Sequence, residues 1–332
     1  MTAYYFLGVP SPATIIGTLS FLFVLDVTAV ALRFISRQRR KQGFQADDWL
    51  TIPALLVTMG MAINMFWAVH TKKLGYKINS LEDMSRGVPT RIHDYVSVTL
   101  APAALSLIKL SCLCLYRRIF VVDKHNLLDR RNLLFAFTIT VISLWGLGLT
   151  LSYLFVCKLS WHLVWAPPWE ALDQCMDFMK LGHFFMYSDF LTDLLVLMIP
   201  VPFIWRLRLG WKKKGVITLV FLLGIFASIC SLFRMLFMLW SFKVGFDPAL
   251  DEGLMTTISD YWFTIEAHVG LLAACLPTLP GLFKGTNIAN TFKTWWTTKT
   301  GSSSSDSKFH GVKRADSDDS VTFQNQHILL KD

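Results

Sequence analysis

Charged side chains are scarce in this sequence. Asp, Glu, Lys and Arg make up 17% of its 332 residues, against about 25% in typical soluble domains. Hydrophobic residues make up 53%, and the mean hydropathy is +0.46. The sequence also lacks G-x-x-x-x-G-K-[ST], G-x-G-x-x-G, H-E-x-x-H and G-x-S-x-G, so no motif predicts nucleotide binding, zinc hydrolysis or serine hydrolysis. These absences argue against a large soluble enzyme.

Long apolar runs are abundant instead. A membrane-spanning helix needs about 20 mainly apolar residues, because the hydrocarbon core is about 30 Å thick and each residue rises about 1.5 Å. The runs are continuous and lack the alternation of a membrane β-barrel. They predict an all-α polytopic membrane protein with one seven-helix domain over 13–283. The expected helices are about 13–35, 49–71, 95–116, 132–156, 182–205, 215–240 and 260–283.

Lysine and arginine predict the orientation of this bundle. Basic residues crowd the connections after the first, third and fifth segments, and the opposite connections hold fewer. The positive-inside rule then places the N-terminus outside and the C-terminus in the cytoplasm. These connections account for the net charge of +9, and they favour contact with anionic membrane lipids over nucleic acid.

The two ends of the chain differ from the apolar domain. Residues 1–12 are expected to form a short outer N-terminus. The first apolar run is too long for a signal peptide, and no basic residue precedes Arg33. Residues 284–332 are rich in Ser, Asp and Lys and are expected to form a disordered cytoplasmic tail. A cytoplasmic signalling partner would meet the protein on that side.

Only six cysteines occur, and the predicted topology divides them. Four fall within expected helices, where they suit small apolar packing positions. Cys157 and Cys175 flank an outer connection, where the oxidising environment favours a disulfide. Neither has neighbours at metal-ligand spacing, so no metal is expected.

Ionisable residues inside the expected helices are costly in lipid and therefore mark candidate sites. At about 1.5 Å per residue, Arg234 and Glu266 lie about 9 Å below the outer face. Asp193 and His268 lie about 12 Å below it, with His268 on a different helical face from Glu266. Asp189 lies one turn above Asp193 on the same face. These five side chains are the candidates for a pocket or an ion-pair network.

Two interpretations of this set stay open. In the first, Arg234 neutralises Asp193 or Glu266 and the pair fixes helix packing. In the second, the set lines a polar pocket that opens to the outside. Asp189, Asp193, Glu266 and Arg234 carry a formal charge of −2 together, so one carboxyl would be expected to hold a proton. An acid catalyst or an amine-binding pocket needs such a group, which makes Asp193 and Glu266 the catalytic candidates.

Two further intramembrane charges have simpler expectations. Lys109 lies near the inner end of the third segment, and its long side chain is expected to reach the membrane surface. Asp26 lies near the middle of the first segment and needs a polar partner that the sequence does not identify. The seventh segment contains no lysine. Retinal rhodopsins tether their chromophore to a lysine there, so retinal is not expected, and no other cofactor is indicated.

Several motifs recur in combination. The second segment opens with ADDWLTIPALL, the third ends with IKLSCLCLYRRIF, and a tryptophan lies between Cys157 and Cys175. The fifth to seventh segments contain DFLTDLLVLMIPVPFIWRL, LLGIFASICSLFRM and YWFTIEAHVGLLAACLPTLPGLF. Together these stretches resemble the fungal rhodopsin-like integral membrane proteins, a family that includes Pth11-type receptor-like proteins and the satratoxin-cluster membrane protein. The residues that match are Thr192, Asp193, Pro200, Pro202, Trp205, Gly224, Arg234, Trp262, Glu266, Gly270, Cys275 and Pro277.

The sequence departs from this family at a few positions. Lys158 stands where a proline usually follows the first outer cysteine, and Pro280-Gly281 replaces an arginine-proline pair. Asp189 matches no motif position and, lying nearer the outer face, could simply be hydrated. No cysteine-rich outer domain precedes the first helix, which favours a pathway role over a surface receptor.

The resemblance implies two classes of function. The first is a membrane component of a fungal secondary-metabolite pathway of the mycotoxin type. It would carry out an acid-type cyclisation or isomerisation, or handle a lipophilic intermediate. The second is a receptor-like sensor of a small extracellular molecule. The sequence leaves open whether any catalysis occurs, and it is compatible with the plasma membrane or the endoplasmic reticulum.

Overall fold

The computed structural model describes residues 10–39, 41, 43–76, 87–121, 129–164, 175–202, 211–244 and 252–281. Within these ranges the chain forms seven α-helices and two short 3-10 helices and contains no strand, which confirms the all-α seven-helix prediction. The helices are α2 (Pro12–Arg39), α3 (Ala46–His70), α4 (Gly87–Phe120), α5 (Arg130–Leu154), η2 (Trp161–Val164), α7 (Phe178–Met198), α9 (Trp211–Val244), α10 (Glu252–Cys275) and η3 (Leu276–Gly281).

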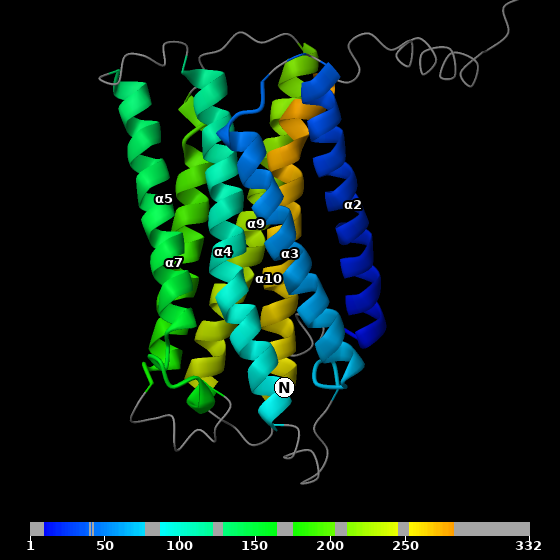
Figure 1. The fold of residues 1–332 in the computed structure, drawn as a ribbon, viewed down its shortest axis with the longest axis vertical. Coiled ribbons are helices and arrows are strands. Elements are labelled where there is room, and N and C mark those ends of the chain that lie inside the picture. The colour runs from blue at the N-terminus through cyan, green and yellow to red at the C-terminus, as the bar shows by residue number, and fades with distance from the viewer. Residues whose placement is uncertain are drawn as a thin grey trace, which may run out of the picture. The chain divides into compact units, whose positions relative to one another are not determined.

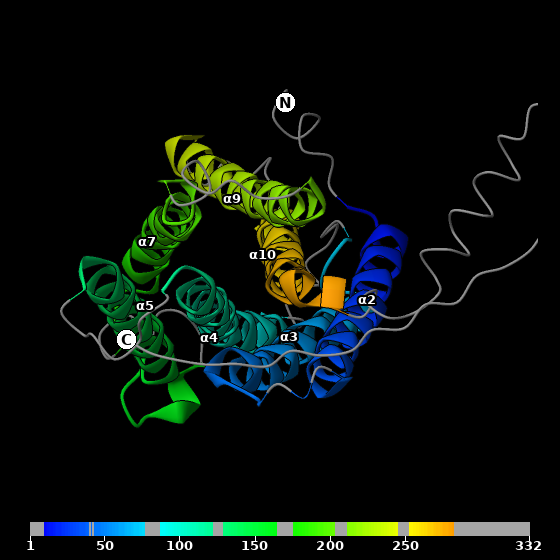
Figure 2. The same cartoon turned by 90° about the horizontal axis from the view of Figure 1, so that it is seen from above.

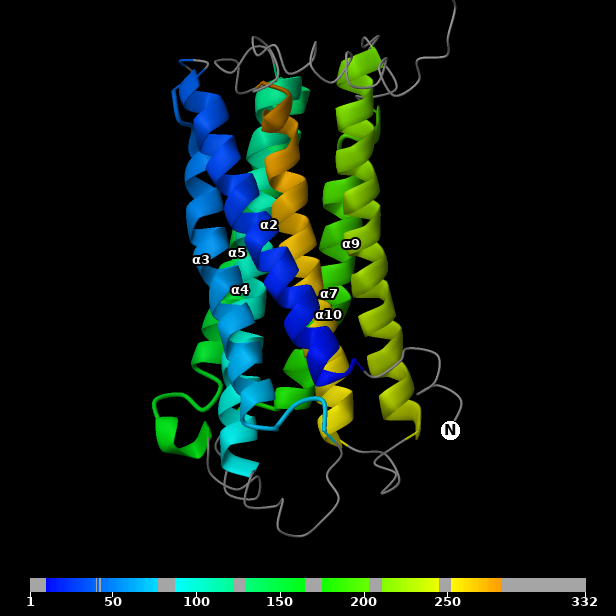
Figure 3. The same ribbon diagram turned by 90° about the vertical axis from the view of Figure 1, so that its right-hand side faces the viewer.

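Consecutive α-helices run in opposite directions, so that α2 begins at one end of the bundle and α10 ends at the other (Figure 1). Seen from above, α4 and α10 lie towards the middle of the bundle (Figure 2). α10 packs against α2, α3, α4 and α9, whereas α4 packs against α3, α5, α7 and α10. The view from the side shows α2 crossing in front of α10 with α9 beside it (Figure 3). The two central helices, α4 and α10, each pack against several others, so buried polar groups can meet along them.

Six of the described helices are long and apolar enough to cross a membrane: α2, α3, α4, α5, α7 and α9. Their outward faces carry large exposed apolar side chains such as Phe21, Phe137 and Leu144, as lipid contact requires. α10 is 24 residues long but bears Asp260 and Glu266, both of which are buried. Its neighbours shield these charges from lipid, which explains why the most central helix is also a polar one. The protein is a multi-pass membrane protein.

Prolines end two helices earlier than the apolar pattern predicts. α7 ends at Met198, two residues before Pro200, and the α-helical part of α10 ends at Cys275, before Pro277. Proline has no backbone N–H to continue the ladder, and its ring crowds the preceding turn. The last residues of the predicted fifth and seventh segments, with Trp205, lie outside the described residues, as do residues 1–9 and the tail from 282 onwards.

A disulfide joins Cys157 to Cys175, as the sequence predicts. The sequence separation is 18 residues, and closing a loop of that size removes about 3 kcal/mol of chain entropy from the unfolded state. Val156, Cys157 and Leu163 form a small buried cluster at this end of α5. The disulfide therefore secures the connection between α5 and α7.

α4 and α5 approach each other closely at one point. A Cβ added to Gly146 on α5 would lie 2.2 Å from the Ser106 Cβ on α4, a distance that no pair of side chains tolerates. By contrast, a Cβ on Gly148 would meet nothing within 4 Å. Only glycine fits at 146, and this contact sets the distance between α5 and α4 next to Trp145.

Candidate functional site

Five charged side chains from four helices meet inside the bundle. They are Lys109 on α4, Asp189 and Asp193 on α7, Arg234 on α9 and Glu266 on α10. We call this set the central charge network. The four smaller exposed fractions range from 0% to 6% of the side chain, whereas Asp193 is 12% exposed. The network is thus buried where α4 and α10 face α7 and α9.

Lys109 is held by hydrogen bonds that its ammonium donates to α7. Its Nζ donates to the Oδ1 of Asp189 at 2.8 Å and to the hydroxyl of Thr192 at 2.8 Å, and it pairs with the Oδ1 of Asp193 at 2.8 Å. The same ammonium lies 4.9 Å from the ring centroid of Trp145 on α5. Asp189 and Asp193 lie one helical turn apart, and Thr192 places its hydroxyl between them. These acceptors surround the ammonium and explain why it is stable here. The expectation that Lys109 reaches the membrane surface is wrong.

Asp189 bridges the two cations of the network. Its Oδ1 accepts from Lys109, and its Oδ2 accepts from the Nη2 of Arg234. Asp189 is fully buried. The interpretation that it is hydrated near the outer face is therefore wrong. Asp189 belongs to no motif, yet it is the only carboxylate among the described residues that contacts both Lys109 and Arg234.

Arg234 joins α9 to α10 as well as to α7. Its Nη1 donates to the Oε2 of Glu266, and its guanidinium lies 3.6 Å from the ring centroid of Phe263. A planar guanidinium can stack on an aromatic ring while its N–H groups donate to carboxylates in its own plane. Of the two partners that the sequence offered for Arg234, the structure selects Glu266, while Asp193 pairs with Lys109.

The formal charge of the network is −1, because three carboxylates face two cations. Three of its buried polar atoms have no hydrogen-bond partner among the described residues: Asp193 Oδ2, Glu266 Oε1 and Arg234 Nε. The nearby hydroxyl of Ser231 does not fill this gap, because it donates to the Ser228 carbonyl at 3.0 Å. The network is therefore closely paired but not fully satisfied.

His268 does not join the network. Its Nδ1 contacts the Oδ2 of Asp26 on α2, and both side chains are 1% exposed. His268 is thus the polar partner that Asp26 requires. The two residues are 242 positions apart, so no local pattern in the sequence could have identified the pair.

A second set of five charges lies where α2, α3 and α4 meet near their ends. We call Arg33, Arg37, Asp47, Asp48 and Arg118 the arginine–aspartate cluster. Arg33 pairs with Asp47 at 2.7 Å and with Asp48 at 2.9 Å, and Arg37 makes the same two contacts at 2.9 and 3.1 Å. Arg118 lies 3.6 Å from Asp47. The spacing of Arg33 and Arg37, one helical turn apart, together with the paired aspartates, was the signal in the sequence for this cluster.

Arg33 also connects the cluster to α10. Its Nη1 donates to the backbone carbonyl of Ala274 in the last turn of that helix, and the Ser36 hydroxyl donates to the Thr278 carbonyl at 2.8 Å. Helix C-terminal carbonyls lack intrahelical donors and carry partial negative charge. The cluster therefore also caps the end of α10.

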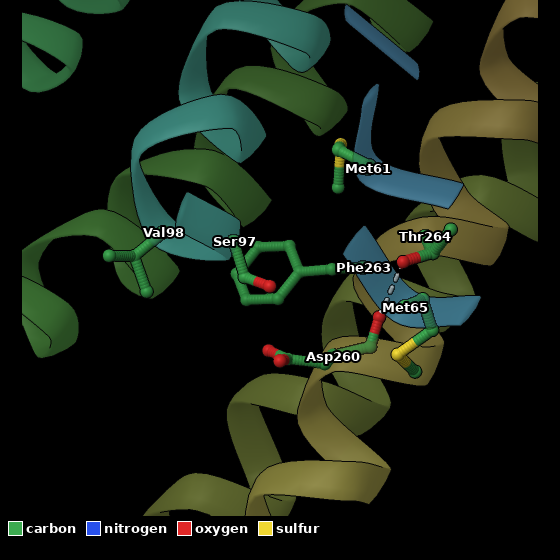
Figure 4. A pocket seen from close by; sticks show the side chains of 7 residues that line it. All are labelled: Met61, Met65, Ser97, Val98, Asp260, Phe263 and Thr264. Atoms are coloured by element: carbon green, nitrogen blue, oxygen red, sulfur yellow. Dashed lines mark hydrogen bonds between the residues drawn. The ribbon is translucent and has the colours of Figure 1, made fainter. Parts of the chain in front are cut away.

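A small cavity of about 10 Å³ lies among side chains of α3, α4 and α10 (Figure 4). That volume is space for about one water molecule. Phe263 lines it and also packs on Arg234, while Asp260 lines it and pairs with the Nε2 of His93 at 2.8 Å. The lining residues are Met61, Met65, Ser97, Val98, Asp260, Phe263 and Thr264. One aromatic ring thus separates the cavity from the central charge network.

Two groups of side chains bring metal-ligand atoms within 4.8 Å of one another: His93 with Asp94 and Asp260, and Asp189 with Asp193 and Glu266. In the second group Lys109 and Arg234 already neutralise two of the three charges. In the first, the His93–Asp260 hydrogen bond accounts for the contact.

At the end of α7 that follows the disulfide, Asp177 caps the helix. Its Oδ1 accepts from the backbone N–H groups of Met179 and Lys180, each at 3.2 Å. The side-chain hydrogen bond from Lys180 lowers the pKa of Asp177. This carboxylate is exposed, unlike those of the central charge network, so a substitution at Asp177 is a control for substitutions of the buried carboxylates.

The fold and its buried charges define a polytopic seven-helix membrane protein whose central helices are joined by intramembrane ion pairs. The family model of the fungal rhodopsin domain matches residues 32–285, which extend from the end of α2 through α10. The chain belongs to this family, which confirms the resemblance drawn from its motifs.

Three relatives are similar to this chain over part of their length. It is 28% identical over 277 residues to the polyenoic acids biosynthesis gene cluster protein Ba17b of Metarhizium anisopliae, covering 76% of this chain and 68% of that protein. It is 25% identical over 265 residues to the receptor GIN3 of Arthrobotrys oligospora, covering 78% and 59%. It is 25% identical over 120 residues to fugralins biosynthesis cluster protein 2 of Gibberella zeae, covering 36% and 29%.

The chain thus spans about two thirds of the first relative and less of the other two. No solved structure gives a significant match. Its relatives include both biosynthesis-cluster proteins and a receptor, so membership of the family is compatible with both classes of function.

Proposed function

We propose that the protein serves a fungal secondary-metabolite pathway as a receptor-like membrane component, which binds a small lipophilic molecule and responds by rearranging α9 and α10. The pathway context is supported by the relatives named for biosynthesis clusters. The receptor-like mode is supported by the relative named as a receptor and by the geometry around Phe263.

Phe263 is the observation that carries this proposal. Its side chain lines the small cavity, and its ring also contacts the guanidinium of Arg234, 3.6 Å from the ring centroid. The ring also stacks on Phe185 of α7, with centroids 5.3 Å apart. A molecule that widens the cavity would displace Phe263 and disturb the contacts of Arg234 with Asp189 and Glu266. Ligand binding would thereby change the relative stability of two helix arrangements, which is what a receptor needs.

Intramembrane acid catalysis is the second candidate. It is favoured by Asp193, whose Oδ2 has no partner among the described residues and whose side chain is the most exposed of the network. A general acid must reach its substrate and hold a proton. The pairing of Asp193 with Lys109 and of Glu266 with Arg234 weighs against this role, because each carboxyl group is already engaged by a cation.

Deletion of the gene, followed by metabolite profiling and measurement of pathway transcripts, separates the two candidates. The receptor-like role predicts that product and pathway transcripts fall together, with no single intermediate accumulating. Complementation with Phe263→Leu should restore the response only in part, whereas Asp177→Asn should restore it fully. Accumulation of one unprocessed intermediate with normal transcripts, rescued by wild type and not by Asp193→Asn, would instead establish the enzyme. An unchanged metabolite profile and transcript response would contradict both.

A further inference from the structure

The central charge network carries more negative than positive charge. Its residues lie between four helices and away from the helix ends, where no helix dipole compensates the excess. Three carboxylates face one ammonium and one guanidinium. Isolated charge is expensive in a bilayer core, and intramembrane ion pairs offset that cost only when they balance. Lys109 and Arg234 are the only cations among the described residues that contact this set, so one carboxylate lacks a counter-charge.

Two buried oxygens independently indicate where the missing charge would go. Glu266 Oε1 and Asp193 Oδ2 have no hydrogen-bond partner among the described residues, although Glu266 is only 2% exposed. An ionised carboxylate can only accept, so these oxygens need a donor or a cation. A water molecule would satisfy the hydrogen bonding but would leave the charge of −1 in place.

We propose that the central charge network binds one unit of positive charge, carried by a proton or an alkali cation, on the free oxygens of Asp193 and Glu266. Asp193 is the point of entry, because its side chain is 12% exposed. The groups that face this position are Lys109 and Cys112 from α4, Asp189 from α7, Arg234, Ser231 and Cys230 from α9, and Glu266 from α10. This inference concerns the charge state alone and stands whether or not the protein is a receptor.

The arginine–aspartate cluster gives a contrast within the same molecule. It has the opposite imbalance, three guanidiniums against two carboxylates, and Arg118 at its edge is 18% exposed. Its Asp47 and Asp48 each contact more than one arginine. The same charge-uptake argument therefore does not apply there, which makes Asp47 a matched control.

The test uses the purified full chain in lipid nanodiscs. Thermal midpoints are measured from pH 5 to pH 8 at constant ionic strength, in choline chloride and in sodium chloride, for wild type, Glu266→Gln, Asp193→Asn and the controls Asp47→Asn and Asp177→Asn. If the folded state binds a proton that the unfolded state releases, stability falls as pH rises. The expected loss is about 3 °C per pH unit for wild type in choline, and it should be smaller in Glu266→Gln or Asp193→Asn only. If the charge is an alkali cation, sodium raises the midpoint at pH 8, and the same two variants remove this effect.

Infrared spectroscopy reads the proton directly and requires no variant to survive heating. A protonated carboxyl gives a carbonyl band that shifts in heavy water, and this band should be present in wild type and lost in Glu266→Gln or Asp193→Asn. Should neither variant fold, the wild-type band and its response to sodium still decide the question. Absence of a protonated-carboxyl band together with no sodium dependence of the midpoint would overturn the proposal.

Discussion

The central charge network and the arginine–aspartate cluster each contain five ionisable side chains, yet they solve the problem of buried charge differently. In the cluster, Asp47 and Asp48 lie in the first turn of α3, while Arg37 and Arg118 lie in the last turns of α2 and α4. The helix dipole favours acids at N-termini and bases at C-termini. Helix ends, multiple arginines and a partly exposed edge therefore all stabilise these charges.

The network lacks this support. Its five residues lie within the bodies of α4, α7, α9 and α10, where backbone groups are already paired and the helix dipole has little local effect. Each charge depends on the side chains around it, without the support of a helix end. The comparison teaches that equal numbers of charged side chains do not imply equal tolerance: the loss of one cation should cost more in the network than in the cluster.

Replacement of Arg234 by methionine should have the largest effect. It leaves Asp189 with one cation and Glu266 with none, and breaking a buried pair by removing one partner costs about 3–5 kcal/mol. We expect little monodisperse protein by fluorescence-detected size-exclusion chromatography. The double variant Arg234→Met/Glu266→Gln, which also removes one of the stranded charges, should recover part of the yield. A single variant as stable as wild type would contradict the role of the network.

Replacement of Arg33 by methionine should cost less, about 2–3 kcal/mol, because hydrogen bonds to charged groups are lost but Arg37 still contacts both aspartates. The measurement is the thermal midpoint in the same lipid, compared directly with Arg234→Met. Equal losses at the two positions would show that helix ends and spare arginines give no protection.

Gly146→Ala tests whether the network depends on the close approach of α5 to α4. The added Cβ would lie 2.2 Å from the Ser106 Cβ, and overpacking of this kind costs at least about 1 kcal/mol. Gly148→Ala is the matched control, since its Cβ meets nothing within 4 Å; it should stabilise the helix by up to about 1 kcal/mol. Opposite signs of the two midpoint shifts are the expected result, and a shared sign would rule out a steric cause.

Trp145→Phe should have the smallest effect. It keeps an aromatic face near Lys109, 4.9 Å from the indole, but weakens the cation–π contact and removes the hydrogen bond from Trp145 Nε1 to the Ser188 hydroxyl at 2.9 Å. We expect a loss of about 0.5–1 kcal/mol, read as a small drop in the thermal midpoint. A loss as large as that of Arg234→Met would mean that Trp145 supports the network in some further way.

Much of the fold could be read from apolar length and loop composition. The helix count and the disulfide are confirmed. The placement of the N-terminus outside and the C-terminus in the cytoplasm, the domain limits and the membrane that holds the protein stay predictions. α7 ends at Met198, before Pro200, and α10 ends at Cys275, before Pro277, although hydropathy continues past both prolines. The prolines themselves were the available signal.

The candidate site was anticipated in its composition but not in its pairing. The depths along the helices suggested that Asp193, Arg234 and Glu266 lie near one another, and the structure brings these side chains together. Depth alone could not place Lys109, because depth measured from an assumed helix end ignores which way a side chain points. Lys109 and Asp189 are 80 residues apart, and their contact depends on how α4 and α7 are rotated about their axes.

The sequence by itself determined that the chain crosses a membrane as a helical bundle and that it carries costly charges inside, because apolar length and composition decide both. Only the tertiary structure decided which cation neutralises which carboxylate. It made Asp189 the bridge, gave Lys109 to Asp193, and paired Asp26 with His268. The physical reason is that ion pairing depends on helix rotation and spacing, which packing contacts such as Gly146 against Ser106 fix only once the helices have assembled.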